Sequence, residues 1–392
     1  MLQVFANANF RFMWGTKWIF MILSAAGLLI SGWAIGARGF NYGIDFAGGT
    51  AVQVKFRDAP RVESVRAALE GRHLGDVNIQ AIGEPEDYEV LIRVEQEKGA
   101  AAEGGEGGGV SAAILEALRS DDDRAALQAG RVDLNAASEA SLAAWLLANP
   151  PGGGAGDASP ATVAAAVVRA RSERGGVFTG IGQVTDAPGV SPEAAALLRD
   201  RAHLGSYALR GVEFVGPTAG RELLRNTGYA ILGSVLGILA YVWVRFHRWT
   251  WGLAAIAALV HDVTIAAGAM ALTGKEFSLP VVAALLTILG YSINDTIVIF
   301  DRIRENLRLY REHDFEEVVN ASVNQTLSRS VLTSFTVFIA VTALLMYGGD
   351  KLNPLSFCLL VGVVAGSYST IFVASALLVI AYRRLGPRYV KA

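Results

Sequence analysis

The sequence LPVVAALLTILGYSINDTIVIF, residues 279–300, contains a single charged side chain, Asp295. A bilayer core of about 30 Å is crossed by a helix of about 20 mostly apolar residues. An ionised carboxylate at the centre of such a helix costs about 2.5 to 3.5 kcal/mol on insertion scales. The stretch therefore predicts a spanning helix whose carboxylate is paired, hydrated or protonated.

The rest of the chain also has the composition of a membrane protein. Of its 392 residues, 52% are hydrophobic and 18% are charged, which is less charge than a soluble domain carries. The net charge of -2 argues against nucleic-acid binding, and the single cysteine, Cys358, excludes an internal disulfide. We expect six spanning helices, at about 18–35, 228–244, 251–272, 279–300, 331–346 and 355–382.

Basic residues in the short loops predict the orientation of these helices, because Lys and Arg are retained on the cytoplasmic side. They gather before the first span, between the second and third, after the fourth and at the C-terminus: Arg11, Lys17, Arg245, Arg248, Arg302, Arg304, Arg308, Arg311, Arg383, Arg384, Arg388 and Lys391. The opposite short loops carry only Lys275 and Lys351. Both termini and the tail 383–392 should be cytoplasmic, and residues 37–227 should lie outside. In a bacterium, where the spans would cross the inner membrane, that outside is the periplasm.

The first apolar stretch has a second interpretation as a cleaved signal peptide. Basic residues precede it, and Ala34-Ile35-Gly36 fits a cleavage triplet. Its length, with Trp18 and Trp33 near its ends, favours a retained helix with interfacial anchors. We therefore assign residues 1–36 to a cytoplasmic N-terminus and the first span.

Residues 37–97 and 206–227 predict a small α+β domain of ferredoxin-like architecture. Residues 50–56 alternate between apolar and polar side chains, residues 62–69 have helical spacing, and 77–81 and 88–94 alternate again. This β-α-β-β order is typical of a two-layer sandwich.

Residues 98–205 interrupt that domain before its last strand and predict a mostly helical insertion. Glycine runs at 104–105, 107–109 and 152–154 indicate flexible joints, and helical patterns lie at about 138–147, 161–172 and 192–201. Turns around 180–182 and 188–190 faintly resemble a helix-hairpin-helix module. Such modules often bind DNA, but without a basic surface a scaffold or protein-contact role is favoured.

Charged residues within apolar stretches are the candidate functional residues. Asp262 lies in the middle of the third span, and Tyr291 and Asn294 lie within one turn of Asp295, so we expect a polar stripe facing the bundle interior. Either aspartate can hold a proton in one conformation and release it when water or a cation arrives. Arg329 is the candidate cation, with an interfacial snorkelling arginine as the alternative.

Other interpretations of these residues remain open. Both aspartates can instead form static interhelical hydrogen bonds, and His261 is equally a proton relay or a packed histidine. Residues 301–330, within the 228–382 helical region, predict an amphipathic helix on the cytoplasmic surface. We expect no metal and no cofactor other than protons, with sodium possible.

The segment GIDFAGGT, residues 43–50, follows the first span. Its glycines Gly43, Gly48 and Gly49 permit tight backbone turns. Asp45 beside Phe46 is either a turn cap or a contact to a substrate, and the spacing favours the cap.

Three motifs together resemble the SecF branch of the SecD/SecF family. They are GIDFAGGT at 43–50, VGPTAGREL at 215–223 and GYSINDTIVIFDRIREN at 290–306, supported by His261-Asp262 and by SRSVLTS at 328–334. The resemblance covers about residues 1–97 and 206–392. The insertion departs from the family pattern, which leaves substrate contact by the external domain open.

The resemblance implies a half-sized member of the RND superfamily. Such a subunit pairs with SecD, associates with the SecYEG channel, YajC and YidC, and uses the proton-motive force to promote export of unfolded polypeptides. It implies the principal proton-linked role for Asp295 and a supporting one for Arg329, while Asp262 matches an acidic family position. The sequence has neither a Walker-type glycine loop with Lys nor an acidic-histidine metal cluster, so we do not expect an enzyme.

Three alternatives remain. One is an RND exporter half for lipids or small molecules. A large cleft-forming external domain would favour it, but this chain offers only one modest α+β unit with an insertion. An intramembrane aspartyl protease would use Asp262 and Asp295 as a pair, but the Gly-x-Gly-Asp pattern is missing around them. A structural assembly factor would tolerate Asp295→Asn.

Overall fold

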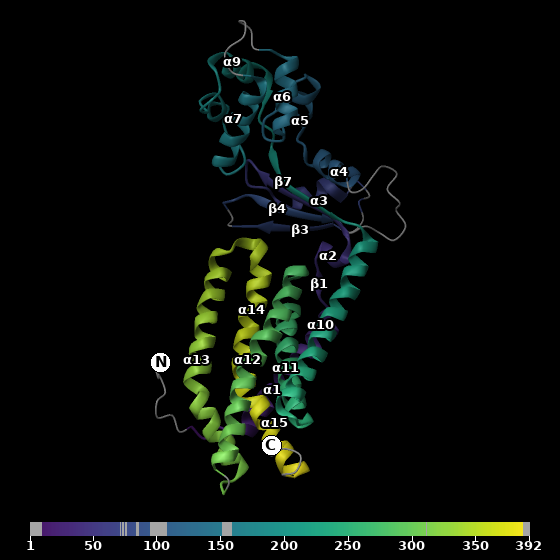
Figure 1. Cartoon of the computed structure of the whole chain (residues 1–392). Helices are drawn as coiled ribbons and strands as arrows, with labels where there is room; N and C mark the ends of the chain where they lie inside the picture. The colour runs from purple at the N-terminus through teal and green to yellow at the C-terminus, as the bar shows by residue number, and fades with distance from the viewer. Residues whose placement is uncertain are drawn as a thin grey trace. The chain divides into compact units, whose positions relative to one another are not determined.

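The computed structural model describes residues 10–70, 72, 74, 77–83, 86–94, 108–150, 159–310 and 312–386. The chain forms two compact units (Figure 1): a membrane unit of residues 1–45 and 222–392, and an external unit of residues 46–221. Some of the predicted features lie outside the described residues. They are the glycine joints at 104–105 and 152–154, the basic residue Arg311 and the tail beyond residue 386.

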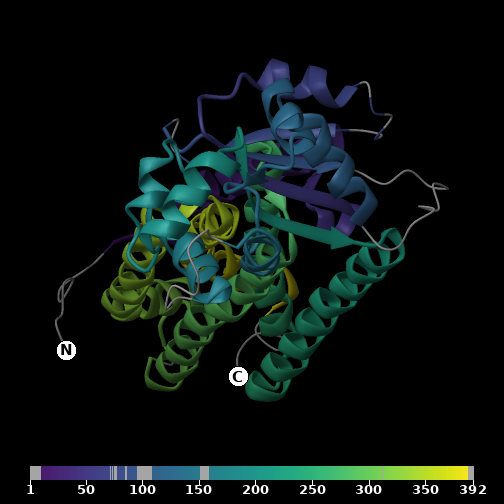
Figure 2. The same ribbon diagram turned by 90° about the horizontal axis from the view of Figure 1, so that it is seen from above.

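The membrane unit contains helices long and apolar enough to form the six predicted spans, and this prediction is confirmed. They are α1 (Thr16–Arg38), α10 (Pro217–Phe246), α11 (Trp249–Thr273), α12 (Leu279–Leu309), α13 (Phe315–Tyr347) and a last span. That last span consists of α14 (Gly349–Ser369), a π-helical turn (Thr370–Ala374) and α15 (Ser375–Leu385). Figures 1 and 2 show α10 along the outside of the bundle.

The prediction of a separate surface helix at 301–330 is wrong. α12 continues to Leu309 and α13 begins at Phe315, so the segment is the ends of two long helices joined by a short connection. Ile303, on the apolar side of that pattern, is fully buried in the main core of the bundle, and so is Val319 on α13. Tertiary packing, rather than a membrane surface, covers this amphipathic pattern.

Small residues let α1 pack closely on α11. A Cβ atom added at Gly268 would collide with Ser31, and one at Gly27 would lie 2.9 Å from the Ile265 side chain. Helices in membranes associate through such close approaches because burial from lipid supplies little driving force. This packing favours the retained-helix interpretation of α1 over a cleaved signal peptide.

A buried ion-pair network joins α1, α13 and α15. Lys17 Nζ lies 2.7 Å from Glu316 Oε1, and both side chains are 3% exposed. Arg383 contacts the other carboxylate oxygen of Glu316. Removing one partner of a buried pair typically costs about 3 to 5 kcal/mol, so this network fixes the ends of three spans together.

The external unit contains the predicted ferredoxin-like sheet. Its strands are β2 (Gly49–Phe56), β3 (Val77–Ile82), β4 (Glu89–Val94) and β7 (Tyr207–Val215), antiparallel in the order β3-β4-β2-β7. Helix α3 (Val62–Glu70) packs on one face, where its buried side chains Val65 and Leu69 join the core of Val52, Val54 and Ile92.

The first helix of the predicted insertion belongs instead to this sheet domain. Helix α4 (Gly108–Leu118) buries Ile114 and Ala117 in the sheet core, and the Tyr207 hydroxyl donates to the Leu115 carbonyl at 2.5 Å. It occupies the place of the second helix in a β-α-β-β-α-β fold. The boundary predicted at residue 98 was therefore placed too early, because glycine at 108–109 begins a helix here.

The remaining insertion is a separate helical body. It comprises α5 (Asp121–Gln128), β5 (Val132–Asp133), α6 (Glu139–Ala148), α7 (Pro160–Glu173), α8 (Gly182–Thr185), α9 (Pro192–Arg201) and β6 (Ala202–His203). The predicted helical patterns correspond to α6, α7 and α9, each capped by a serine side chain. Leu134, Val167, Phe178 and Leu198 lie in one buried core. The DNA-binding alternative stays a prediction.

Asp123 bonds the start of the insertion to the residues where the chain returns to the sheet. Its carboxylate accepts hydrogen bonds from Ser206 Oγ at 2.5 Å and Ser120 N at 3.1 Å, and lies 2.7 Å from His203 Nε2. Burial raises the pKa of Asp123, but the hydrogen bonds of Ser206, His203 and Ser120 outweigh burial and hold the pKa at about 2. The bonded carboxylate is therefore ionised throughout the ordinary pH range.

We predict that Gly268→Ala destabilises the membrane unit by about 1 to 3 kcal/mol, because the added methyl group collides with Ser31 on α1. Gly233→Ala on α10 is the matched control, since its added Cβ would meet nothing within 4 Å. Thermal unfolding of the full chain in detergent measures both. Equal melting temperatures for the two variants would contradict the close packing of α1 on α11.

We predict that Asp123 contributes about 2 kcal/mol to the stability of the external unit at neutral pH. Because its pKa is lowered on folding, this contribution is present above the ordinary pKa of 3.8 and is lost as pH falls towards about 2. Urea unfolding of the full chain, followed by hydrogen exchange in the external unit, compares wild type with Asp123→Asn. The difference in unfolding free energy between wild type and Asp123→Asn should become smaller as pH falls from about 5 to about 2. A difference that does not change with pH would contradict a stabilising role for the ionised Asp123 carboxylate.

Candidate functional site

Asp262 is the centre of a buried hydrogen-bond cluster between three spans. It lies on α11 and is fully buried. Its Oδ2 accepts hydrogen bonds from Ser292 Oγ on α12 at 2.6 Å and from Ser369 Oγ on α14 at 2.7 Å, and its Oδ1 lies 2.9 Å from His261 Nδ1. Both oxygens of this carboxylate are therefore bonded, and α11, α12 and α14 are tied together through it.

Local sequence features of α14 bring Ser369 to Asp262. A Cβ atom at Gly366 would lie 3.2 Å from Ser292 and 3.6 Å from Asp262, so the glycine allows the helices to approach. The π-helical turn starts directly after Ser369, and such turns are frequent at functional sites. The last span thus has an irregular backbone where it meets the carboxylate.

His261 is packed as well as bonded. Its ring stacks on Tyr368 with centroids 6.1 Å apart, and the Tyr368 hydroxyl donates to the Phe20 carbonyl on α1 at 2.6 Å. Ser24 Oγ lies 3.1 Å from that hydroxyl. The arrangement extends the polar cluster to α1, and both interpretations of His261, relay and packing, remain compatible with it.

Asp295 lies in a different environment from Asp262. Its side chain is 3% exposed, yet among the residues that the structure describes it makes no hydrogen bond and no ion pair within 4.0 Å. Arg329 on α13 interacts with it electrostatically without touching it. The neighbouring Tyr291 hydroxyl donates to Ser334 Oγ on α13 at 3.0 Å. Asp295 is thus a buried carboxylate with no fixed partner, beside the α12–α13 contact.

Asn294 does not face the bundle interior, so the expectation that it shares a polar stripe with Asp295 is wrong. Its side chain is exposed in this chain. Adjacent residues on an α-helix point about 100° apart, and the interior positions here are taken by Ser292, Asp295 and Thr296. The functional role assigned to Asn294 stays a prediction. Arg329 is exposed too.

The cluster includes residues that the sequence analysis missed. Ser292 and Ser369 bond Asp262, and Thr296 Oγ1 lies 3.3 Å from Thr370 Oγ1 in the same buried region. The signal available in the sequence was small hydroxyl side chains at helical spacing within apolar stretches. Such residues often bond only their own backbone, so the pattern alone does not single them out.

The segment after α1 runs alongside the start of α12. Strand β1 (Asn41–Tyr42) pairs in parallel with β8 (Glu276–Phe277), and Gly43 N donates to the Phe277 carbonyl at 3.0 Å. Asp45 Oδ2 then accepts from Leu279 N, the first amide of α12, at 2.8 Å. Asp45 is therefore a cap, as the spacing favoured, but of a helix distant in the sequence.

Backbone conformation and close approaches favour glycine in this segment. A Cβ atom at Gly43 would require the flexible Glu276 side chain to move. Gly48 and Gly49 have φ angles of 75° and 132°, which L-residues rarely adopt. A Cβ atom at Gly48 would also lie 2.8 Å from Pro217 Cα. Phe46 follows Asp45 in the short helix α2 (Ile44–Ala47) and is buried. No contact to a substrate is needed to explain these residues.

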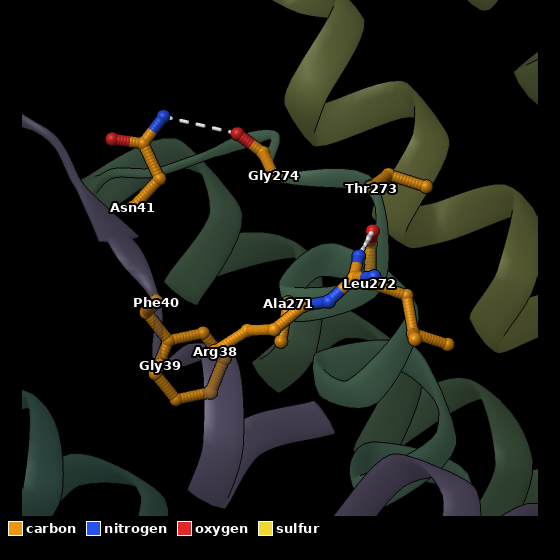
Figure 3. Close-up of a pocket in the computed structure, with 8 residues that line it drawn as sticks. All are labelled: Arg38, Gly39, Phe40, Asn41, Ala271, Leu272, Thr273 and Gly274. Carbon is orange, nitrogen blue, oxygen red and sulfur yellow. Dashed lines mark hydrogen bonds between the residues drawn. The ribbon is translucent and has the colours of Figure 1, made fainter. Parts of the chain in front are cut away.

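A pocket of about 320 Å³ lies where α1 and α11 end (Figure 3). Arg38 Nη1 donates to the Leu272 carbonyl at 2.8 Å, and Asn41 Nδ2 donates to the Gly274 carbonyl at 3.0 Å. These donors satisfy carbonyls that the end of α11 leaves free. The eight lining residues include no carboxylate, histidine or cysteine, so the pocket offers no group that exchanges a proton at neutral pH.

Family models match both candidate regions. The model described as "Protein export membrane protein SecD/SecF, C-terminal" matches residues 197–384, which include Asp262, Asp295 and Arg329. The model "SecD/SecF GG Motif" matches residues 33–60, which include Gly43 through Gly49.

Known proteins resemble the chain over most of its length. It is 36% identical to "Protein translocase subunit SecF" of Koribacter versatilis over 389 residues, covering 96% of this chain and 93% of that protein. The SecF of Desulfurispirillum indicum is 37% identical, with coverage of 91% and 86%. The crystal structure of SecDF, a translocon-associated membrane protein from Thermus thermophilus, is 31% identical with a TM-score of 0.61; the alignment covers 96% of this chain but 39% of that one.

We predict that Asp45→Ala destabilises the membrane unit by about 1 kcal/mol, because the first amide of α12 loses its cap. Asp45→Asn keeps an acceptor oxygen and should lose less. Asp200→Ala is the control, since that side chain is 84% exposed in the insertion. Thermal unfolding in detergent ranks the three variants, and a wild-type value for Asp45→Ala would show that the cap contributes nothing.

Proposed function

The chain belongs to the SecD/SecF family as a SecF-type accessory subunit of the protein translocase, and from this membership we propose that it uses proton movement across the inner membrane to promote polypeptide export. The observation that carries the proposal is the contrast between its two intramembrane carboxylates. Asp262 has bonds on both oxygens, whereas Asp295 is buried without a fixed partner.

An unpaired carboxylate in hydrocarbon is stable only when it is protonated or reached by water or a cation. Asp295 therefore prefers to hold a proton while the α12–α13 contact is closed. An arginine side chain is a permanent cation, so Arg329 is the group on α13 with which an ionised Asp295 carboxylate would pair. Movement of α13 relative to α12 is the step that couples protonation to conformation.

The energy available to such a step is sufficient to bias a conformational equilibrium. One charge crossing the membrane yields about 2.3 kcal/mol per 100 mV. A difference of about 1.4 kcal/mol already changes a ratio of two states tenfold. Repeated proton passage can thus bias the protein between two conformations, with protons rather than a nucleotide as the energy source. Sodium ions could take the place of protons in the same mechanism.

SecD is the proposed partner. The chain corresponds to 39% of the Thermus SecDF chain, and a SecD subunit would supply the remainder. Asn294 and Arg329 are polar, lie within spans and are exposed in this chain alone. Polar groups facing lipid are costly, so partner helices covering α12 and α13 explain both residues. The family resemblance supports contacts with SecYEG, YajC and YidC and a location in the inner membrane. The loop charges support cytoplasmic termini.

The proposed subunit is not an enzyme, and the alternatives lack specific support. A protease would need Asp262 and Asp295 to share a proton as a dyad. Within the described residues, the partners of Asp262 are Ser292, Ser369 and His261, and Asp295 is bonded to none of them. No observation favours an exporter of lipids or small molecules over polypeptide export.

We predict that Asp295→Asn removes the part of export that depends on the proton gradient, because an amide cannot exchange a proton at neutral pH. Export of a secreted reporter is followed in cells whose own SecF is replaced by the variant, with and without an uncoupler. The variant should match uncoupled wild type, and the uncoupler should then have no further effect through this subunit. Asp200→Asn in the insertion is the control. Gradient-dependent export at the wild-type level in Asp295→Asn would remove the proposal.

A further inference from the structure

A column of hydroxyl side chains follows one face of α13. Ser322, Thr326, Ser330 and Ser334 are spaced by four residues, the interval that places side chains above one another on a helix. All four are buried, with exposed fractions of 0%, 8%, 5% and 8%. The column therefore runs inside the protein along the first part of α13, up to the start of its apolar stretch.

Two hydrogen bonds show that the column faces α12. At one end the Tyr291 hydroxyl donates to Ser334 Oγ at 3.0 Å, and at the other Asn306 Nδ2 donates to Ser322 Oγ at 2.8 Å. The two helices are thus antiparallel, with Thr326 and Ser330 between these contacts. Asp295 lies one turn from Tyr291, as Ser330 lies one turn from Ser334, so Asp295 and Ser330 are at the same level.

Two polar groups along this contact have no partner. Ser330 Oγ and Asn306 Oδ1 are buried and make no hydrogen bond within the part of the chain that the structure describes. The Asp295 side chain is 3% exposed and also makes no hydrogen bond to the described residues. By contrast, Thr326 and Ser322 donate to backbone carbonyls of their own helix at 2.9 and 2.7 Å. Buried polar groups without protein partners are normally satisfied by ordered water.

We propose that Ser330, Thr326, Ser322 and Asn306 line a chain of water molecules that conducts protons between Asp295 and the cytoplasmic end of the α12–α13 contact. This inference rests on the proposed function and names the route that Asp295 uses. Four residues of helix rise about 6 Å, and two hydrogen bonds through one water span about 5.6 Å. One water in each interval therefore completes the chain.

The transfer needs only O–H bonds. The Asp295 carboxyl gives its proton to the first water, and each following water or hydroxyl accepts one proton and passes another onward. One proton leaves at the Asn306 end, and a carboxylate remains at Asp295. The charged pair formed by Arg302 and Glu305, joined at 2.7 Å, borders this end and contacts solvent.

A purely structural role for the column is the competing explanation, because hydroxyl groups also hold membrane helices together. The two explanations differ in what they predict for removal of one hydroxyl. A structural role changes stability, whereas a conducting role changes proton flux at unchanged stability. Ser330 is the most informative position, since its hydroxyl makes no bond that a mutation would break.

The test measures proton entry into proteoliposomes that contain the full chain with its SecD partner, using an internal pH dye and an imposed membrane potential. Ser330→Ala and Thr326→Val should each lower the flux about fivefold or more at unchanged melting temperature. Ser330→Thr, which keeps the hydroxyl, should retain the wild-type flux. Thr336→Val is the matched control, because its hydroxyl bonds its own backbone on the exposed face of α13.

Asp295→Asn separates failure of the water chain from failure of the proposed function. If Asp295→Asn abolishes flux while Ser330→Ala and Thr326→Val conduct like wild type, the water chain is overturned and the proton-coupling role stands. If Asp295→Asn also conducts like wild type, the proposed function itself fails. An equal loss in Thr336→Val overturns the water chain, because the effect would not depend on the column.

Discussion

The cost of a charge in hydrocarbon is the constraint on which this structure depends. Two carboxylates, Asp262 and Asp295, lie within the apolar stretches of the spans, and their surroundings differ. Asp262 is surrounded by hydroxyl and imidazole groups from three helices, so its position is fixed. Asp295 is equally buried but has no such partners among the described residues. A fixed carboxylate stabilises the bundle, and a carboxylate without a fixed partner is free to change its protonation state.

Helix α12 connects these features with the rest of the molecule. Its first amide is capped by Asp45, Ser292 in its middle bonds Asp262, and Asn306 near its end bonds α13. The segment that supplies Asp45 follows α1 and pairs with β8 immediately before α12. Helix α12 therefore links the Asp262 cluster and α13 with the segment that follows α1.

The external unit shows how a large insertion leaves a small fold intact. Helix α4 completes the ferredoxin-like domain, and the chain returns to β7 after the insertion. Tyr207, the first residue of β7, bonds Leu115 near the end of α4, so the exit and re-entry of the chain lie together. Asp123 bonds Ser206 beside the same point. The insertion can thus fold around its own core of Leu134, Phe178 and Leu198 without disturbing strand order.

The sequence by itself determined the six spans, the strand and helix patterns of the external domain and the two buried carboxylates, because span length, periodicity and the cost of charge are local properties. It did not determine which groups meet. Asp45 caps a helix that starts 234 residues later, and Asp262 finds Ser369 across 107 residues. The exposure of Asn294, the long helices through 301–330 and the place of α4 were likewise decided by tertiary packing. A sequence pattern fixes the face a residue occupies on its own helix, whereas its partners depend on how distant helices cross.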